Sequence, residues 1–251
     1  MILRSILKQT YLLSLALIMS FNLVAQESGA VFEEIIVTAE KRSESLQDIS
    51  QAVTVLSGDD LDNRQISTFV DISAIAPGVN VAKNEGFKTV ITIRGVGYET
   101  NQNAIATPSV SYHLDGIYVA SPYSLQTDFL DLERVEVLRG PQGTLFGQNS
   151  TGGAMNVITA APSTEEVFGS ADLTLGDHGL TKLRSFINIP LNDKAAVRAS
   201  FISNKRDGFT DNLTNGQDLD DADSISARVR FSYEPRDDFR ANFTAQVFDE
   251  D

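Results

Sequence analysis

Residues 224–248 read SISARVRFSYEPRDDFRANFTAQVF, and two alternating segments in this stretch decide the fold. Along residues 224–234, apolar and polar side chains alternate, so they lie on opposite faces of an extended strand. One face carries Ile225, Ala227, Val229, Phe231 and Tyr233, and the other carries Ser226, Arg228, Arg230, Ser232 and Glu234. Residues 239–249 repeat the pattern. Strands of about ten residues with one apolar face are typical of membrane-spanning barrels.

The alternation extends upstream over residues 166–176, 180–189 and 195–205, so we expect five strands after Pro162. Short connections join the second strand to the third and the fourth to the fifth, whereas a long polar segment, 206–223, separates the third from the fourth. Alternating short turns and long loops favour a membrane barrel over the alternative, a soluble β-sandwich. Five strands cannot close in lipid. We therefore expect the chain to be a fragment of a longer protein.

Before Pro162 the sequence predicts a small α+β domain. Ser57 with Asp60, and Thr68 with Asp71, have the spacing of a capping box and predict two short helices. Asp115-Gly116 stands between two alternating runs and predicts a β-hairpin. Further strands are predicted over residues 52–56, 89–94, 134–138 and 154–159.

The first 25 residues have the organisation of a secretory signal peptide. Arg4 and Lys8 precede an apolar stretch, 11–24, which ends at the small residue Ala25. The alternative is a transmembrane anchor, but a spanning helix needs about 20 apolar residues and this stretch is shorter. We therefore expect residues 1–25 to be removed on export.

Composition excludes several classes of function. Acidic residues outnumber basic ones by 34 to 20, which argues against nucleic-acid binding. The chain has no Cys, so it has no disulfide, Cys-ligated zinc or thiol nucleophile. Its only histidines, His113 and His178, have no partner at metal-ligand or catalytic-triad spacing. We expect no catalytic residues, no metal site and no cofactor.

Two further motifs resemble ligand sites but lack essential residues. Residues 147–152 have the spacing of a phosphate loop, yet Gly153-Ala154 follows where Lys and Ser or Thr are required. Residues 207–223 hold six Asp, which suggests calcium, but the Gly and the acid of an EF-hand loop are missing at their positions. A solvated external loop is the preferred interpretation, with weak divalent-cation binding as the alternative.

The residues carry a family resemblance. EEIIVTAEKR at 33–42 resembles a TonB box with its downstream flank. IRGVG at 93–97, LDGIYV at 114–119 and DLERVEVLRGPQGTLFGQNSTGGAMNVIT at 131–159 resemble the plug signature of TonB-dependent outer-membrane receptors. The implied fold is mainly β: a signal peptide (1–25), a TonB box and linker (26–45), an α+β plug domain (46–160) and the first five antiparallel strands of an incomplete transmembrane β-barrel (161–251).

The resemblance implies a 22-stranded barrel with the plug inside it, located in the bacterial outer membrane and not an enzyme. It implies active import of a scarce nutrient, driven through TonB and its inner-membrane energising complex. A ferric siderophore or another iron complex is the expected ligand, and cobalamin, haem or an oligosaccharide are alternatives. Expected partners are TonB, outer-membrane lipid and this small molecule, without nucleic acid.

The resemblance also implies site residues. The expected TonB-binding residues are Glu34, Ile35, Ile36, Val37, Thr38 and Ala39, a β-prone segment that suits strand addition to a partner's sheet; the alternative is an edge strand of the plug. Arg94 and Arg139 are implied to pair with glutamates on the inner barrel wall; the alternative is an ordinary surface Arg in each case. Tyr98 and Tyr123 lie in polar loops and are candidates to face the ligand.

Two rival functions remain to be weighed. A passive porin or structural barrel would not need a separate folded N-terminal domain, which this sequence predicts. A soluble periplasmic enzyme or binding protein would need a catalytic constellation or a closed core, and the sequence indicates neither.

Export should remove the signal peptide after Ala25. N-terminal sequencing of protein extracted from the outer membrane is then expected to start at Gln26. A mature chain that still begins at Met1 would rule out the signal-peptide interpretation.

Overall fold

The computed structural model describes residues 36–37, 44–45, 51–84, 88–97, 107–120, 128–214, 216, 218–236 and 238–250. The predicted signal peptide lies outside this range. Within it, no helix combines the length and the apolar character that a membrane crossing requires.

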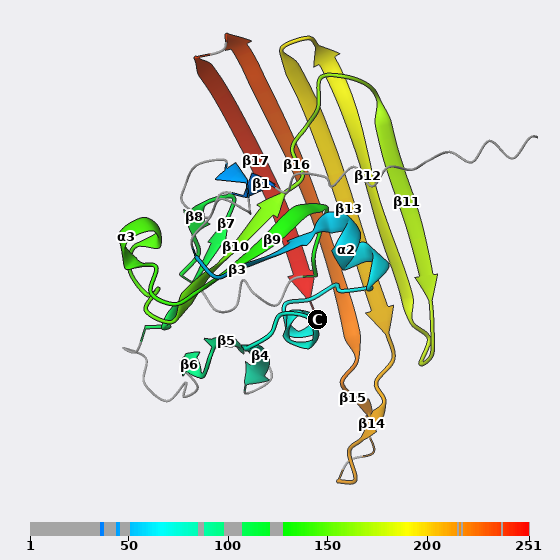
Figure 1. Ribbon diagram of the computed structural model, residues 1–251. Coiled ribbons are helices and arrows are strands. Elements are labelled where there is room, and N and C mark those ends of the chain that lie inside the picture. Colours follow the sequence, from blue (N-terminus) through cyan, green and yellow to red (C-terminus); the bar gives the residue numbers. More distant parts are fainter. Residues whose placement is uncertain are drawn as a thin grey trace, which may run out of the picture. The chain divides into compact units, whose positions relative to one another are not determined.

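Residues 51–160 contain an α+β domain built on a five-stranded sheet (Figure 1). The strand order is β3 (Val53–Ser57), β9 (Leu132–Arg139), β10 (Gly153–Thr159), β7 (Val110–Leu114) and β8 (Ile117–Tyr118). Strand β10 is central: it pairs antiparallel with β9 and parallel with β7. A second sheet contains β4 (Val79–Asn84), β5 (Lys88–Ile93) and β6 (Val96–Gly97). The prediction missed β4, because only Val79 and Val81 alternate with polar residues there.

Of the two predicted helix caps, the first is present, whereas the second helix begins at Val70 with Phe69 as its N-cap and without a side-chain cap. Ser57 and Asp60 form the capping box of α2 (Gly58–Asn63). Asp71 accepts hydrogen bonds from the Thr68 backbone and hydroxyl, both at 2.9 Å. The segment that follows, η1 (Val70–Ala74), is a 3₁₀-helix of five residues, so the second predicted helix is short and tightly wound. A further short helix, α3 (Gly143–Phe146), was not predicted.

The predicted hairpin is also present. Asp115 and Gly116 have φ of +49° and +79°, and they connect β7 to β8. Two consecutive positive φ values define the turn that matches the twist of paired strands. The Asp115 carboxylate accepts hydrogen bonds from the backbone and the hydroxyl of Thr159, both at 2.8 Å, which joins the turn to the end of β10.

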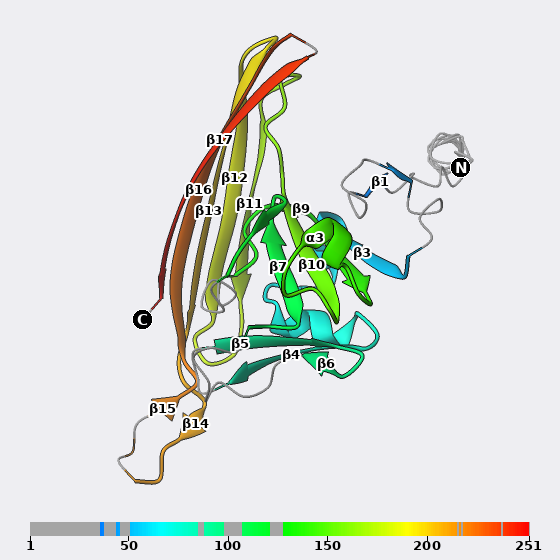
Figure 2. The ribbon, with the colours of Figure 1, turned by 90° about the vertical axis from the view of Figure 1, so that its left-hand side faces the viewer.

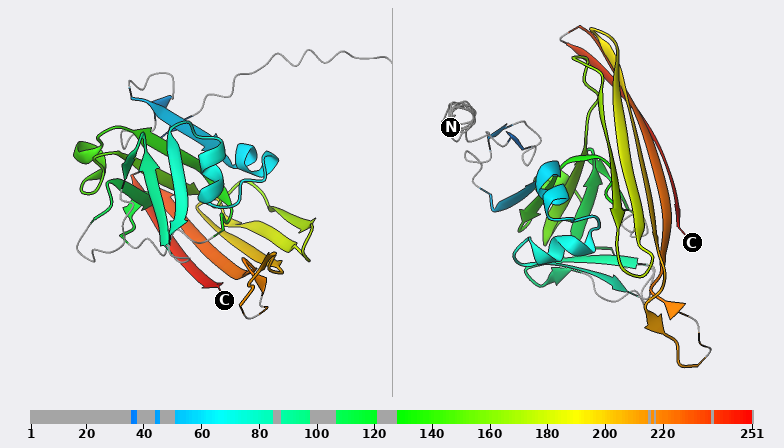
Figure 3. Two further views of the ribbon diagram at one scale, coloured as in Figure 1. Left: turned by 90° about the horizontal axis from the view of Figure 1, so that it is seen from below. Right: turned by 90° about the vertical axis from the view of Figure 1, so that its right-hand side faces the viewer.

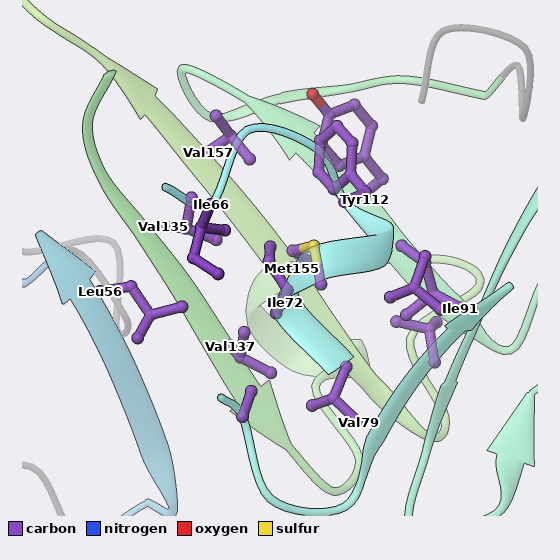
Figure 4. Close-up of a cluster of buried hydrophobic side chains, with 14 of the residues drawn as sticks. Leu56, Ile66, Ile72, Val79, Ile91, Tyr112, Val135, Val137, Met155 and Val157 are labelled. Atoms are coloured by element: carbon purple, nitrogen blue, oxygen red, sulfur yellow. The ribbon is translucent and has the colours of Figure 1, made fainter. Parts of the chain in front are cut away.

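The core lies between the helical segments and the sheet, where Ile72, Val137 and Met155 gather (Figure 4). These three side chains are fully buried. The Phe69 ring makes edge contacts with Tyr112 and Phe129, at centroid distances of 5.2 and 4.8 Å. Such contacts add to the free energy gained by burying the rings.

Five long strands follow in an antiparallel meander, the long sheet, and they run side by side in every view (Figure 2, Figure 3). They are β11 (Phe168–Leu175), β12 (Thr181–Asn192), β13 (Ala195–Arg206), β16 (Ala222–Arg236) and β17 (Phe239–Glu250). All five correspond to predicted strands. The acidic segment between β13 and β16 was expected to be a loop, but it contains a small hairpin of β14 (Thr210–Asp211) and β15 (Asp218–Leu219).

The faces of the long sheet are inverted relative to a soluble protein. On β16, the apolar residues Ile225 and Val229 are 48% and 47% exposed, whereas Arg228 is 5% exposed and Ser226 is buried. Exposed apolar side chains on one face with buried polar ones on the other are what a barrel in lipid requires.

Residues 36 and 37 of the expected TonB box are extended, as predicted, but they are not isolated. Strand β1 (Ile36–Val37) pairs antiparallel with β2 (Glu44–Ser45). An extended segment exposes backbone donors and acceptors, and here a neighbouring stretch of the same chain pairs with them.

Shortening Met155 to Ala should destabilise the α+β domain by about 2–5 kcal/mol, because the side chain is fully buried and its loss leaves a cavity. Amides of β10 in the full-length protein should then exchange faster with solvent. The matched control is Ile117→Ala, since Ile117 is 72% exposed. Equal exchange in the two variants would contradict this assignment of the core.

Candidate functional site

Charged side chains of the α+β domain meet charged side chains on the buried face of the long sheet. In each pair, the domain supplies the acid and a strand of the sheet supplies the base. The pairs are Asp62–Arg184, Asp115–Arg230 (3.8 Å), Asp128–Lys182 (3.8 Å) and Asp131–Arg198 (2.6 Å).

Asp131 and Arg198 form a bidentate pair. Arg198 donates from Nε to one carboxylate oxygen at 2.7 Å and from Nη2 to the other at 2.6 Å. The Ser200 hydroxyl, two residues along β13, donates to the same carboxylate. The side chains of Arg198 and Asp131 are only 8% and 9% exposed. A buried bidentate pair of this kind is stronger and more specific than an exposed ion pair.

Aromatic rings hold the Arg198 guanidinium in place. Its central carbon lies 4.0 Å from the ring centroid of Phe186 on β12 and 5.4 Å from that of Phe168 on β11. The two rings contact each other edge-on at 5.9 Å. A guanidinium close to the face of an aromatic ring is stabilised by the charge distribution of that ring.

A second acid, Asp128, lies nearer the long connection between β13 and β16. Its Oδ2 accepts hydrogen bonds from Asn204 at 3.1 Å and from Ser224 at 3.0 Å. The Lys182 ammonium lies 3.8 Å from Oδ1. All of these donors come from polar positions of the long strands, so the sheet satisfies this buried carboxylate.

Two arginines of β16 bind backbone carbonyl groups of the domain. Arg228 donates to the carbonyl oxygen of Leu130 at 2.7 Å. Arg230 donates to those of Thr159 at 2.6 Å and Ala160 at 3.2 Å. Together they bind the backbone just before β9 and at the end of β10, two neighbouring strands of the domain's main sheet.

Asn188 holds the connection between the domain and the sheet. This fully buried amide accepts a hydrogen bond from the Ser163 backbone at 2.8 Å. It also donates to the carbonyl oxygens of Ser163 and Glu166, each at 2.9 Å. All three contacts fix residues that lie between β10 and β11.

The predicted plug arginines make local contacts. Arg139 donates to the Pro77 carbonyl at 3.1 Å and to the Thr54 hydroxyl at 2.6 Å. Burial, and then the charge of Arg94, lower the pKa of the Arg139 guanidinium. Arg94 lies in a turn with φ of +52° and is exposed. These contacts lie within the α+β domain, so pairing with wall glutamates stays a prediction.

Most other predicted site residues lie outside the described range: Glu34, Ile35, Thr38, Ala39, Tyr98 and Tyr123. Of the two histidines, His113 is buried and its Nε2 lies 3.2 Å from the Ser111 hydroxyl, while His178 lies against the Phe209 ring. In the part of the chain that the structure describes, no group of three or more potential metal ligands comes together.

Sequence reasoning missed the acidic residues that bind the sheet, although a signal for them exists. The bases Lys182, Arg184, Arg198, Arg228 and Arg230 all occupy polar positions of alternating strands. A row of cations on a face turned away from lipid needs anionic partners, because an unpaired buried charge is costly. The partners Asp128 and Asp131 come just before β9 and carry no motif of their own.

Sequence comparison relates this chain to known proteins. Residues 45–154 match the family model described as the TonB-dependent receptor plug domain. The pesticin receptor of Yersinia pestis is 34% identical over 146 residues, which cover 56% of this chain and 20% of that protein. The iron-regulated outer membrane virulence protein of Vibrio cholerae is 26% identical over 239 residues, covering 88% of this chain and 35% of that protein.

The fold is shared with solved structures. The ferric yersiniabactin uptake receptor of Yersinia pestis superimposes with a TM-score of 0.74 at 23% identity, covering 84% of this chain and 33% of that chain. The present chain therefore spans a fifth to about a third of the length of these proteins.

Replacing Asn188 by Leu should loosen the connection between the domain and the sheet. The change leaves one backbone N–H and two carbonyl groups without their partner, at about 1–3 kcal/mol for each buried group that stays unpaired. The Ser163 amide in the full-length protein is expected to exchange faster with solvent. The control is Asn192→Leu on the same strand, where the side chain is exposed. Unchanged exchange at Ser163 would show that Asn188 does not hold this connection.

Proposed function

Because this chain belongs to the TonB-dependent receptor family, we propose that it forms the plug and the first wall strands of a transporter that actively imports a scarce nutrient across the bacterial outer membrane. The plug is the α+β domain of residues 51–160, and the wall is the long sheet. The observation that carries the proposal is the set of acid–base contacts between them.

These contacts favour a gated transporter over a passive porin. A folded domain bound to the polar face of the wall occupies space that a passive channel would leave to solute. Because buried pairs such as Asp131–Arg198 resist separation, ligand passage requires work on the plug. The proposed source of that work is TonB, energised from the inner membrane.

We place TonB at residues 34–39. Ile36 and Val37 adopt strand conformation, which supports strand addition as the mode of binding. Their pairing with Glu44 and Ser45 spans only two residues, so a partner strand could replace it at little cost. TonB would then bind backbone groups that β2 now occupies.

We propose a ferric siderophore or another iron complex as the ligand, with cobalamin, haem or an oligosaccharide as alternatives. The similarity to the iron-regulated outer membrane virulence protein of Vibrio cholerae and to the ferric yersiniabactin uptake receptor supports this choice. Tyr98 and Tyr123 remain our candidates for aromatic contact with the ligand. Arg94 and Arg139 remain candidates to pair with wall glutamates beyond the described strands.

The coupling role of residues 34–39 can be tested with proline. Ile36→Pro or Val37→Pro should abolish energised uptake in the full-length receptor, because proline has no backbone N–H to donate to a partner strand. Ile36→Ala keeps the N–H and should have a much smaller effect. The experiment measures surface binding and uptake of the same labelled ferric siderophore in matched strains.

Loss of uptake with retained surface binding would support the proposal, since β1 pairs with β2 and belongs neither to the two sheets of the plug nor to the long sheet. Normal transport by both proline variants would exclude residues 34–39 as the coupling site.

A further inference from the structure

We propose that Arg198 and Asp131 are the positioning pair that keeps the plug closed against the wall. This inference rests on the proposed function. It assigns the closure to the Asp131 carboxylate of the plug and to its binding site on the wall, the socket, which consists of Arg198 and the side chains around it. The polarity of this pair is opposite to that of the pairs implied by the family resemblance, in which the plug supplies arginines and the wall supplies acids.

The socket is built by the wall alone. Phe186 on β12 and Phe168 on β11 lie against the Arg198 guanidinium. The Ser200 hydroxyl on β13 adds a third donor for the same carboxylate, and none of these residues belongs to the plug. The aromatic contacts fix the orientation of the guanidinium, so its two donors point to where a carboxylate binds. A preorganised socket loses little side-chain entropy when the plug arrives.

The carboxylate is fixed just as firmly on the plug. Asp131 has φ of +49°, a backbone conformation that Asp adopts more readily than most residues. Its carbonyl oxygen accepts a hydrogen bond from Ala160 at 3.0 Å, which ties the start of β9 to the end of β10. Arg228 binds the neighbouring Leu130 carbonyl. A force on Asp131 is therefore transmitted to β9 and β10 of the plug sheet.

The other ion pairs between plug and wall are either more exposed or more widely separated than Asp131–Arg198. Asp62 and Arg184 are 58% and 29% exposed, so water screens their attraction. The Asp128–Lys182 and Asp115–Arg230 pairs are separated by 3.8 Å, longer than a hydrogen bond. Among the described ion pairs between plug and wall, only Asp131–Arg198 is both bidentate and buried.

Removing one member of this pair should open a leak. Asp131→Asn leaves the Arg198 cation buried without its counter-charge, and Arg198→Gln does the same to the Asp131 carboxylate. The plug should then leave its closed position more often, and solute should enter without energy. Arg198→Lys keeps the charge but loses the bidentate geometry, so its leak should be intermediate.

The experiment uses the full-length receptor in strains with and without TonB. It measures the entry of vancomycin, a large hydrophilic antibiotic that an intact outer membrane excludes. Both neutral variants should admit the antibiotic in either strain. The double variant Asp131→Asn with Arg198→Gln should leak no more than either single variant. Its entry rate should therefore be about tenfold lower than independent effects of the two substitutions would give, which corresponds to about 1.4 kcal/mol.

The matched control is Lys205→Gln, which also removes a cation from β13 but lies in an exposed pair with Asp223 on the wall itself. Heat-modifiable migration on gels identifies variants with a folded barrel, and Arg198→Lys replaces any variant that fails this check. Folded variants without a leak would overturn the proposal, as would single effects that simply multiply in the double variant. Because a leak needs neither TonB nor a siderophore, this result stands apart from any failure of the uptake experiment.

Discussion

The contact between plug and wall depends on the pairing of buried charges. Most apolar side chains of the long strands lie on the exposed face of the sheet, and the opposite face carries the cations Lys182, Arg184, Arg198, Arg228 and Arg230. A buried cation without a partner is strongly unfavourable. The acidic residues of the plug meet this requirement, so one set of contacts stabilises the wall and seats the plug.

Much of the fold could be predicted because its signals are local. Alternation gave the five long strands, Asp115-Gly116 gave the hairpin and Ser57 with Asp60 gave the helix cap. The short strand β4 and the β14–β15 hairpin were missed, because each contains few alternating apolar residues and depends on its pairing partner. Strand pairing is not local in sequence, so pattern alone does not predict it.

The site was less predictable for the same reason. Asp131 and Arg198 are 67 residues apart, one just before β9 of the plug and the other on β13 of the long sheet, so no motif links them. The family motif drew attention to Arg94 and Arg139, whose described contacts are within the plug. The sequence does contain a row of basic residues at polar positions of the long strands. Because buried cations need anionic partners, this row could have directed the search to acidic residues of the plug.

The distance between plug and wall tests the central claim most directly. The 251 residues contain no native cysteine, so spin labels can be attached at Thr144→Cys on α3 and Ala245→Cys on the outward face of β17, both exposed positions. Pulsed electron paramagnetic resonance on the full-length receptor without TonB should give one narrow distribution of distances between the two labels. Adding Arg198→Gln should broaden it and shift part of it to other distances. An unchanged narrow distribution would contradict the view that the cationic face of the wall holds the plug.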